Sequence, residues 1–372
     1  MKKTKLVAFY LPQFHAIPEN DKAWGEGFTE WDNVKKGKKF RLNQYQPHVP
    51  LNNNYYSLLD LSTMQKQAEL ASNYGVDAFC FYHYYFKGGK KLLEKPIENW
   101  LNNSDINFEY CLSWANEPWS KRWDGSENEV IVEQDYGGKS EWKLHFEYLL
   151  PFFKDKRYLR DENGYPVFLI YKPKEIPQLT EMLDYWKTLA KSEEFGSIKF
   201  LMQFPQYDCK DIYYFDGIVE FEPANTLNKM FSNNSKKFTY CISHPLDTMF
   251  IIKHKLLNVL KNNNLVVFPY NMIVKNNLKN GMDEKTYPGV FTSWDNTARR
   301  GKNATVYLGS TPDKFQYFLT EKLKKSNKDL LFINAWNEWA EGAHLEPDEK
   351  YGYAYLEAVR NAKESAINYN SK

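Results

Sequence analysis

Eight short apolar runs recur along the chain, and each is followed by a polar loop and usually by a helical pattern. The runs are nearly continuous in apolar, β-branched and aromatic residues, which is typical of parallel strands covered by helices. Eight strands alternating with helices predict an α/β fold, a single (β/α)8 TIM barrel domain over residues 1–372. The expected strands are 6–11, 78–82, 110–114, 167–171, 200–204, 217–221, 289–294 and 330–335.

Capping and periodicity signals mark the helices between these runs. Thr311 followed by Pro312 predicts a helix start, because threonine caps the first turn and proline fits the first helical position. The segment 62–65 fits a capping box, and Gly75 stands where that helix should end. Apolar stripes at helical spacing predict four buried faces: Leu61, Met64, Ala68 and Ala71; Trp142, Phe146, Leu149 and Phe153; Leu179, Leu183, Trp186 and Ala190; Phe315, Phe318, Leu319 and Leu323.

Two departures from a minimal barrel are expected. The loop after the first run is longer than a βα unit needs, and the Asn- and Lys-rich segment 225–287 predicts an insertion between strands six and seven. That insertion should hold one or two helices, with room for a short strand. A doubly wound open sheet is the alternative fold, but no glycine-rich phosphate turn follows the first run, where such a fold would place it.

Charge and composition restrict the class of partner. The formal net charge is +2, and no concentrated basic patch indicates a nucleic-acid partner. No 18-residue apolar run and no signal-peptide core are found, so we expect no integral membrane segment and a cytoplasmic location, the inner face of the membrane included.

The four cysteines lack a CxxC pair, which predicts free thiols in a reducing compartment. No metal and no cofactor are expected, because no HExxH or similar ligand spacing occurs; the oligomeric state is left open.

Polar and aromatic residues gather just after the predicted strands, where a barrel builds its active-site face. Aromatic rings cover the C–H faces of sugar rings, while amides and carboxylates pair with hydroxyls, so this composition is typical of a carbohydrate site. We expect Trp24, Trp31, Trp114 and Trp294 to line one cleft. The full set of predicted substrate-binding residues is Tyr10, Trp24, Glu30, Trp31, His83, Tyr84, Trp114, Asn116, Glu117, Trp294, Asp295, Arg299, Trp336, Asn337 and His344.

Glu338 and Glu341 are the predicted catalytic carboxylates. Breaking a glycosidic bond requires one carboxyl group to protonate the departing oxygen and a second to act as nucleophile or base, and in a retaining enzyme the two should lie about 5–7 Å apart. Where the last strand turns toward a helix, both residues can face one pocket. Two other interpretations compete: Glu117 paired with one of the later carboxylates, or a structural ion pair with Arg299 or Arg300.

Six segments of the chain resemble the WbsX-type family found with bacterial polysaccharide biosynthesis, which is classed as glycoside-hydrolase-family-99-like. The resemblance implies a (β/α)8 barrel. Family 99 proper is more distant, and its members are retaining endo-acting α-mannosidases and α-mannanases; by this resemblance Glu338 is the base that deprotonates the sugar's 2-hydroxyl and Glu341 is the acid. Ala340 stands where those hydrolases can carry histidine. The matching segments are 8–15, 25–31, 46–47, 114–117, 294–300 and 334–347.

Three functions remain open from the sequence. The first is an enzyme that cleaves or transfers an α-glycosidic bond of an oligo- or polysaccharide, free or lipid-linked, in bacterial cell-surface polysaccharide metabolism. The second is a glycosyltransferase that uses an activated sugar donor in O-antigen or capsule synthesis, although no nucleotide-binding turn is found and the pair at 208 and 211 lacks Asp-x-Asp spacing. The third is a carbohydrate-binding protein without catalysis.

Overall fold

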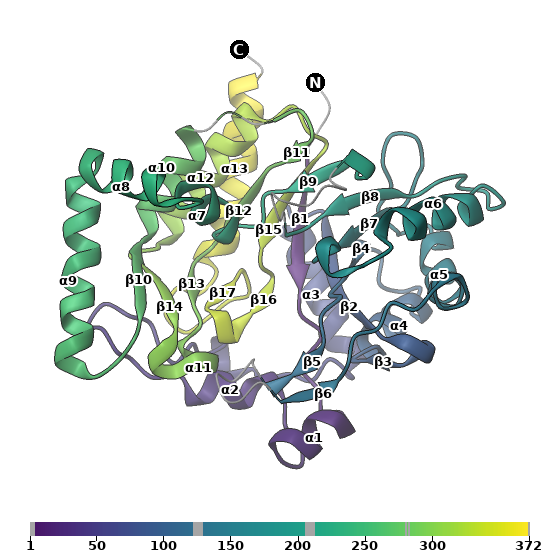
Figure 1. The fold of residues 1–372 in the computed structure, drawn as a ribbon, viewed down its shortest axis with the longest axis horizontal. Coiled ribbons are helices and arrows are strands. Elements are labelled where there is room, and N and C mark those ends of the chain that lie inside the picture. The colour runs from purple at the N-terminus through teal and green to yellow at the C-terminus, as the bar shows by residue number, and fades with distance from the viewer. Residues whose placement is uncertain (1–3, 122–128, 205–212, 280, 282, 371–372) are drawn as a thin grey trace.

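The computed structural model describes residues 4–121, 129–204, 213–279, 281 and 283–370. A ring of parallel strands forms its centre, and the strands follow one another around the ring in the order of the chain (Figure 1). The first six ring strands are β1 (Lys5–Tyr10), β2 (Ala78–Tyr85), β4 (Glu109–Trp114), β7 (Val167–Ile170), β8 (Lys199–Met202) and β9 (Gly217–Val219).

The ring closes at the segment 286–291. Here β11 (Thr286–Tyr287) pairs with β9, while β12 (Gly289–Phe291) pairs with β15 (Leu330–Asn334), which in turn pairs with β1. Only Pro288 separates β11 from β12, and a proline has no N–H to donate to a neighbouring strand. Parallel strands pair from β1 around to β9 and, through the segment 286–291, back to β15 and β1, so the predicted (β/α)8 barrel is confirmed. The predicted strand 289–294 ends early, at Phe291, because Trp294 leaves the barrel and pairs with β14 (Thr305–Leu308).

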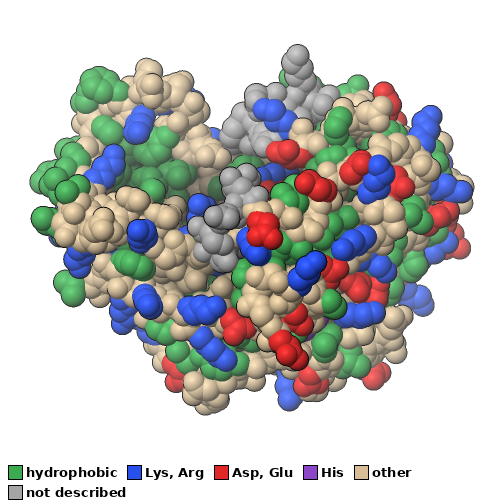
Figure 2. Space-filling model, turned by 60° about the horizontal axis from the view of Figure 1, so that its bottom comes forward, with side chains coloured by type: hydrophobic (Ala, Val, Ile, Leu, Met, Phe, Trp, Pro, Cys, Tyr) green, Lys and Arg blue, Asp and Glu red, His purple; other side chains and the backbone are tan. Residues whose placement is uncertain are grey.

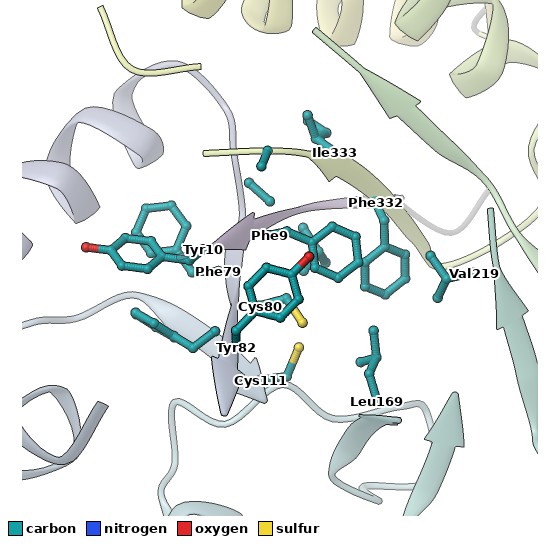
Figure 3. Packing of buried hydrophobic residues seen from close by; sticks show 14 of the residues in the cluster. Phe9, Tyr10, Phe79, Cys80, Tyr82, Cys111, Leu169, Val219, Phe332 and Ile333 are labelled. Atoms are coloured by element: carbon teal, nitrogen blue, oxygen red, sulfur yellow. The ribbon is translucent and has the colours of Figure 1, made fainter. Parts of the chain in front are cut away.

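Aromatic side chains fill the barrel interior (Figure 3). Phe9 stacks on Tyr82 and on Phe332, with ring centroids 5.9 and 5.6 Å apart, and meets the edge of Phe221. Cys80 and Cys111 are register partners on β2 and β4, and both are buried free thiols. A filled interior leaves the mouth of the barrel as the place for a site. Cys241 is also a free thiol, and Cys209 lies outside the described residues.

The outer helices begin where local chemistry satisfies their first N–H groups. The predicted cap on α12 is correct: the Thr311 hydroxyl accepts a hydrogen bond from the Lys314 N–H. The predicted capping box at 62–65 is wrong, because the carboxylate of Asp60 accepts from Ser62 N–H and caps α3. The covering helices are α3 (Leu61–Asn73), α4 (Lys95–Asn102), α5 (Lys139–Lys154), α6 (Leu179–Ala190), α7 (Ala224–Met230), α10 (Tyr270–Lys279), α12 (Pro312–Lys325) and α13 (Ala354–Asn370).

The insertion between the sixth and seventh strands contains more helices than the one or two predicted, and the short strand for which the prediction left room is present. Besides α7 and α10 it contains α8 (Asn234–Ser243) and α9 (Pro245–Lys261), at the left edge of Figure 1. It also contains β10 (Val266–Pro269), which pairs with β14 (Thr305–Leu308) beside β13 (Trp294–Asp295) in a separate three-stranded sheet. Apolar residues stand on two faces of α9, which blurs the one-sided stripe that reveals a helix.

The long loop after β1 is present as expected. It contains α1 (Pro18–Trp24), α2 (Glu30–Lys36) and the short helix at Leu51–Asn53, and α1 and α2 lie at the bottom of Figure 1 with the two-stranded ribbon β5 (Trp119–Ser120) and β6 (Val130–Val132). Among the described residues no helix has the length and the apolar character that a membrane crossing requires.

Candidate active site

The chain turns sharply after β15 and presents two carboxylates. It forms a small hairpin of β16 (Asn337–Glu338) and β17 (Ala343–His344), with a short helix at Trp339–Glu341 between them. The buried Asn337 side chain accepts from Leu11 N–H at 2.7 Å and donates to Leu11 C=O at 3.0 Å, which ties the hairpin to the end of β1. Asn337 was a predicted substrate contact, but its amide is used to hold this turn.

Gly342 makes the hairpin possible. Its φ is +61°, a left-handed conformation that favours glycine. A Cβ atom there would lie 3.1 Å from Nε2 of His48 and 3.2 Å from Cβ of Asp295. A larger residue would therefore push the hairpin away from its support.

Arg299 joins three carboxylates in the buried site. From α11 (Thr297–Arg300) its Nε donates to Glu30 at 2.7 Å, Nη1 to Glu341 at 2.7 Å and Nη2 to Glu338 at 3.1 Å. Since one planar guanidinium binds both catalytic candidates, their nearest oxygens lie within about 8 Å of each other. The structure thus brings Glu338 and Glu341 together, with Glu30 behind the arginine.

This arrangement places more negative than positive charge in a dry environment. Burial, reinforced by the Glu341 charge, raises the pKa of Glu338 to about 8, while Arg299 opposes the rise. Burial also raises the pKa of Glu341, and again the Arg299 guanidinium opposes it. Burial alone would lower the pKa of Arg299, but the three carboxylates outweigh it and raise that pKa well above its ordinary value. The pair is therefore suited to hold a proton near neutral pH.

Glu338 and Glu341 open into a pocket at the mouth of the barrel, which encloses about 560 Å³ with the solvent at its entrance included. Its walls come from the ends of β2, β4, β7 and β9. Tyr84, Glu117, Trp294 and Arg299 were predicted for this site. The remaining lining residues were not in the predicted set: Tyr82, Ala115, Pro118, Trp119, Tyr171 and Phe221. Tyr171 and Phe221 end their predicted strands, so the sequence placed them at the barrel mouth, although neither was predicted to bind substrate.

Glu117 lines this pocket and forms an ion pair with Lys172, which follows β7. A pairing with Lys121 is not formed, because that lysine binds Glu129 at 2.7 Å. Asn116 beside it is buried: its Nδ2 donates to Lys172 C=O and its Oδ1 accepts from Lys172 N–H, both at 2.8 Å. Asn116 therefore joins the ends of β4 and β7, and Glu117 carries the polar group that faces the pocket.

The prediction that four tryptophans line one cleft is wrong for three of them, because Trp294 lines this pocket but Trp24, Trp31 and Trp114 do not. Trp31 is buried, and its Nε1 donates to Tyr56 C=O. Trp114 is buried in the helix layer, where its ring stacks near Trp186 and its Nε1 donates to Tyr85 C=O. Trp31 lies on α2 and Trp114 ends β4, but both rings turn into the core.

Trp24 and three more of the predicted residues lie outside this pocket's lining. Trp24 stacks on Phe28 at the end of α1, with centroids 4.9 Å apart. Trp336 is fully buried against Phe79. Tyr10 donates its hydroxyl to Gln67 inside the protein. His83 meets His145 at 2.8 Å, and burial lowers the pKa of His83 to about 3.

A second pocket lies on the other side of Trp294, which lines both. Asp295 and His344 line it, although both were expected beside the carboxylates. Asp295 accepts from Gln44 at 2.8 Å and from the Thr297 hydroxyl at 2.7 Å, so its carboxylate supports the loop that leads to Arg299.

His48, His344 and Asp348 bring three ligand atoms within 4.8 Å of one another, and within the described ranges they are the group that could hold a metal ion. His344 Nε2 already lies 2.8 Å from His48 Nδ1, and its Nδ1 donates to Glu346 C=O. The two imidazoles thus satisfy each other without an ion.

Comparisons with known proteins agree with this geometry. The family model described as "Glycosyltransferase WbsX" matches residues 6–359. The WxcX proteins of two Xanthomonas campestris pv. campestris strains, B100 and ATCC 33913, are 36% and 35% identical over 366 residues, which is 96% of this chain and 49% of each relative. The chain spans about half the length of these relatives.

Solved structures resemble the whole barrel. The GH99 endo-α-mannosidase of Bacteroides thetaiotaomicron, solved alone and in complex with Bis-Tris propane, aligns with a TM-score of 0.57 over 99% of this chain and 98% of its own, at 12% identity. A glycoside hydrolase-like protein aligns with a TM-score of 0.56 over 97% and 94%, also at 12% identity. At this identity the likeness establishes the fold.

Proposed function

We propose that this chain, which belongs to the WbsX glycosyltransferase family, is a carbohydrate-active enzyme that cleaves or transfers an α-glycosidic bond. Its substrate would be an oligo- or polysaccharide of bacterial cell-surface metabolism. One observation carries the proposal: Glu338 and Glu341 are bound by the same Arg299 guanidinium beneath an aromatic pocket. Breaking a glycosidic bond usually requires two carboxyl groups that face one pocket.

The proposed roles divide the pair. Glu338 acts as the base that takes the proton of the sugar's 2-hydroxyl, whose oxygen then bonds to the anomeric carbon as the leaving oxygen departs. Glu341 donates the proton that the leaving oxygen needs. In the second half, the ionised Glu341 takes a proton from water or from a sugar hydroxyl, whose oxygen bonds to the anomeric carbon as the bond from the 2-oxygen to that carbon breaks. Glu338 returns the first proton to the 2-oxygen. The configuration is retained because the anomeric carbon is attacked twice.

The raised pKa of Glu341 supports its role as the acid, and the raised pKa of Glu338 limits the pH range in which Glu338 can act as the base. A raised pKa suits Glu341 as an acid, since it keeps the carboxyl protonated toward neutral pH. A base must be ionised, so a pKa of about 8 at Glu338 predicts that activity rises with pH toward that value. The Arg299 contact stabilises the ionised form once the proton has left.

Side chains around the pair fit sugar rings. Tyr82, Tyr84, Trp119, Tyr171 and Trp294 give the pocket aromatic walls, which suit the apolar faces of pyranoses. Glu117 offers a carboxylate to sugar hydroxyls at the side of the pocket. We propose a binding role for this group and none in proton transfer, because Glu117 is already neutralised by Lys172.

Transfer from a nucleotide sugar is the second candidate, favoured by the name of the family. The charge of the pocket argues against it: Glu117, Glu338 and Glu341 line the pocket, and Arg299, the lining cation, is bound to carboxylates. Among the described lining residues, a diphosphate would meet no cation that is not already bound to a carboxylate, so its charge would be poorly compensated, which costs binding energy. Transfer between neutral sugars fits the same pocket without this penalty.

A substrate screen tests the proposal. Wild-type protein and Glu341→Gln are incubated with a panel of α-linked oligosaccharides, and products are followed by NMR, which also reports the anomeric configuration. We expect α-configured products from wild type and little from the variant. Turnover of a nucleotide sugar without oligosaccharide cleavage would favour the second candidate, and binding without turnover in both proteins would indicate a carbohydrate-binding protein.

A further inference from the structure

Helix α9 has an apolar face that is open to solvent. The side chains on this face are 50–81% exposed: Leu246, Met249, Ile252, Leu256, Val259 and Leu260. They recur at helical spacing, so the apolar face runs along the whole helix. With the exposed Phe238 and Ile242 of α8 they form what we call the α8–α9 surface. In Figure 2 hydrophobic side chains gather at the left edge of the molecule, where these helices lie.

The opposite face of α9 packs on the protein and holds the helix in place. Phe250 contacts the small core beneath β10 and β14, and His254 is buried. Arg41 donates from Nε to His254 Nδ1 at 3.0 Å and from Nη2 to the backbone oxygen of the same residue. The next residue, Leu42, is 98% exposed, so the residue after this contact presents an apolar side chain to solvent. The α8–α9 surface is therefore fixed in its exposed position.

Positive charge surrounds this surface. The segment 224–279 contains eight lysines and a single acidic residue, Asp247, although the whole chain has a net charge of only +2. Lys236, Lys237, Lys253, Lys255 and Lys261 are all exposed on or beside α8 and α9. Asp247 already accepts a hydrogen bond from the Tyr240 hydroxyl at 2.7 Å. A large apolar face with this local excess of lysine differs from an ordinary solvated helix face.

We propose that the α8–α9 surface docks the protein on an anionic lipid bilayer. The leucine, isoleucine, valine and methionine side chains of α9 enter the boundary between headgroups and acyl chains, and the lysines meet lipid phosphates. A second copy of the chain fits less well, because a symmetric contact would bring two lysine-rich faces together. This inference does not depend on the proposed chemistry, since it concerns a different face of the molecule.

Vesicle flotation of the full chain tests the inference. The protein is mixed with vesicles of phosphatidylcholine alone, or with about 30 mol% phosphatidylglycerol, and the floating fraction is measured. We expect flotation with the anionic vesicles and little with the neutral ones, and a decrease as NaCl is raised from about 0.1 to about 0.5 M. Leu256→Ser with Leu260→Ser, or Lys253→Glu with Lys255→Glu, should lower the partition coefficient about tenfold or more.

Matched variants separate this surface from general effects. Leu59→Ser with Leu61→Ser removes two exposed leucines elsewhere, and Lys139→Glu with Lys143→Glu reverses two exposed charges on α5. Both should float like wild type, and circular dichroism should show all variants folded. Equal flotation of the α9 variants and wild type, or no flotation at all, would overturn the inference. So would a dimer in light scattering that Leu256→Ser with Leu260→Ser dissociates while vesicles remain unbound.

Discussion

Arg299 Nε donates a 2.7 Å hydrogen bond to Oε1 of Glu30, a carboxylate that lies 269 positions earlier in the chain. Both side chains are buried, so this contact joins the long loop after β1 to the segment after β13 inside the site. With Glu30 bound at Nε, the two terminal nitrogens of the guanidinium are directed to Glu338 and Glu341. The orientation of the catalytic candidates thus depends on a residue from the first loop.

Replacing Arg299 with glutamine should destabilise the fold in a pH-dependent way. Removing one partner of a buried ion pair typically costs about 3–5 kcal/mol. Protonation of Glu338 and Glu341, whose pKa values are raised, relieves the uncompensated charge, so the loss should be larger at pH 8 than at pH 5. Urea unfolding at both pH values measures it. The exposed neighbour Arg300 is the control, and Arg300→Gln should change stability by less than about 0.5 kcal/mol. Equal losses at the two pH values would contradict the interpretation.

Glutamine substitutions should distinguish the acid from the base. Glu341→Gln removes the proton donor, so it should impair cleavage of natural oligosaccharides by about 100-fold or more and spare activated aryl glycosides, whose leaving groups need little protonation. Glu338→Gln should abolish both reactions. The measurement is kcat/KM of each variant on both substrates. The acid assignment fails if Glu341→Gln loses activity equally on the oligosaccharide and on the aryl glycoside. Full activity in either variant would mean that the catalytic pair lies elsewhere, with Glu117 as the next candidate.

The pH dependence of the rate follows from Glu338. If this residue is the base, kcat/KM should rise between about pH 6 and pH 8, because the free enzyme becomes active as a group with a pKa of about 8 loses its proton. Measuring kcat/KM against pH with an aryl glycoside, which needs little acid catalysis, separates this rise from the titration of the acid. A profile that falls over the same range would mean that Glu338 acts while protonated, and the two roles would have to be exchanged.

Stability should decrease as pH rises from about 5 to about 8. Burial raises the pKa of Glu346 from 4.5 to about 7 and that of Glu338 to about 8, so the folded protein binds protons that the unfolded chain has released. The stabilisation is complete below about pH 4.5 and is lost as pH passes the folded-state values, at up to about 1.4 kcal/mol per pH unit for each group. Denaturant unfolding across this range measures the slope. Glu346→Gln should flatten it, whereas Glu364→Gln on the exposed side of α13 should not.

Two tryptophans should respond differently to the same substitution. Trp114→Phe should cost about 1–3 kcal/mol of stability, since it removes core volume and the hydrogen bond to Tyr85, and leave KM nearly unchanged. Trp294→Phe should raise KM, since this ring lines the pocket. Urea unfolding and steady-state kinetics on both variants measure these effects. A larger rise in KM for Trp114→Phe than for Trp294→Phe would reverse the assignment.

The sequence predicts the barrel well because each strand is a local apolar run and each covering helix carries its own caps and stripe. It also indicates that Glu338, Glu341 and Arg299 belong to one face, because all three follow predicted strands. What it cannot give is the direction of each ring at a strand end. A run that is apolar on both faces hides which residues point inward. Trp114 was therefore expected in the cleft although its ring lies in the core, and Tyr171 was not among the predicted site residues although it lines the pocket.

Local sequence patterns also fail to predict long-range contacts and the helices of the insertion. The Glu30–Arg299 contact spans almost the whole chain, and no local pattern signals it. Helix α9 carries one apolar face for the protein and a second for solvent, so its periodicity looks unlike that of an ordinary surface helix.

The pairing of β1 with β15 sets an order on synthesis. Leu11 leaves the ribosome 326 residues before Asn337, whose side chain closes the turn that carries Glu338. At typical elongation rates the first strand waits about 15–65 s for this partner, with one edge lacking its native neighbour. The proposed activity should then be absent from nascent chains that lack Glu338 and should appear in one late step. An exposed strand edge is prone to mispairing, so slow translation or truncation before 330 should favour chaperone dependence.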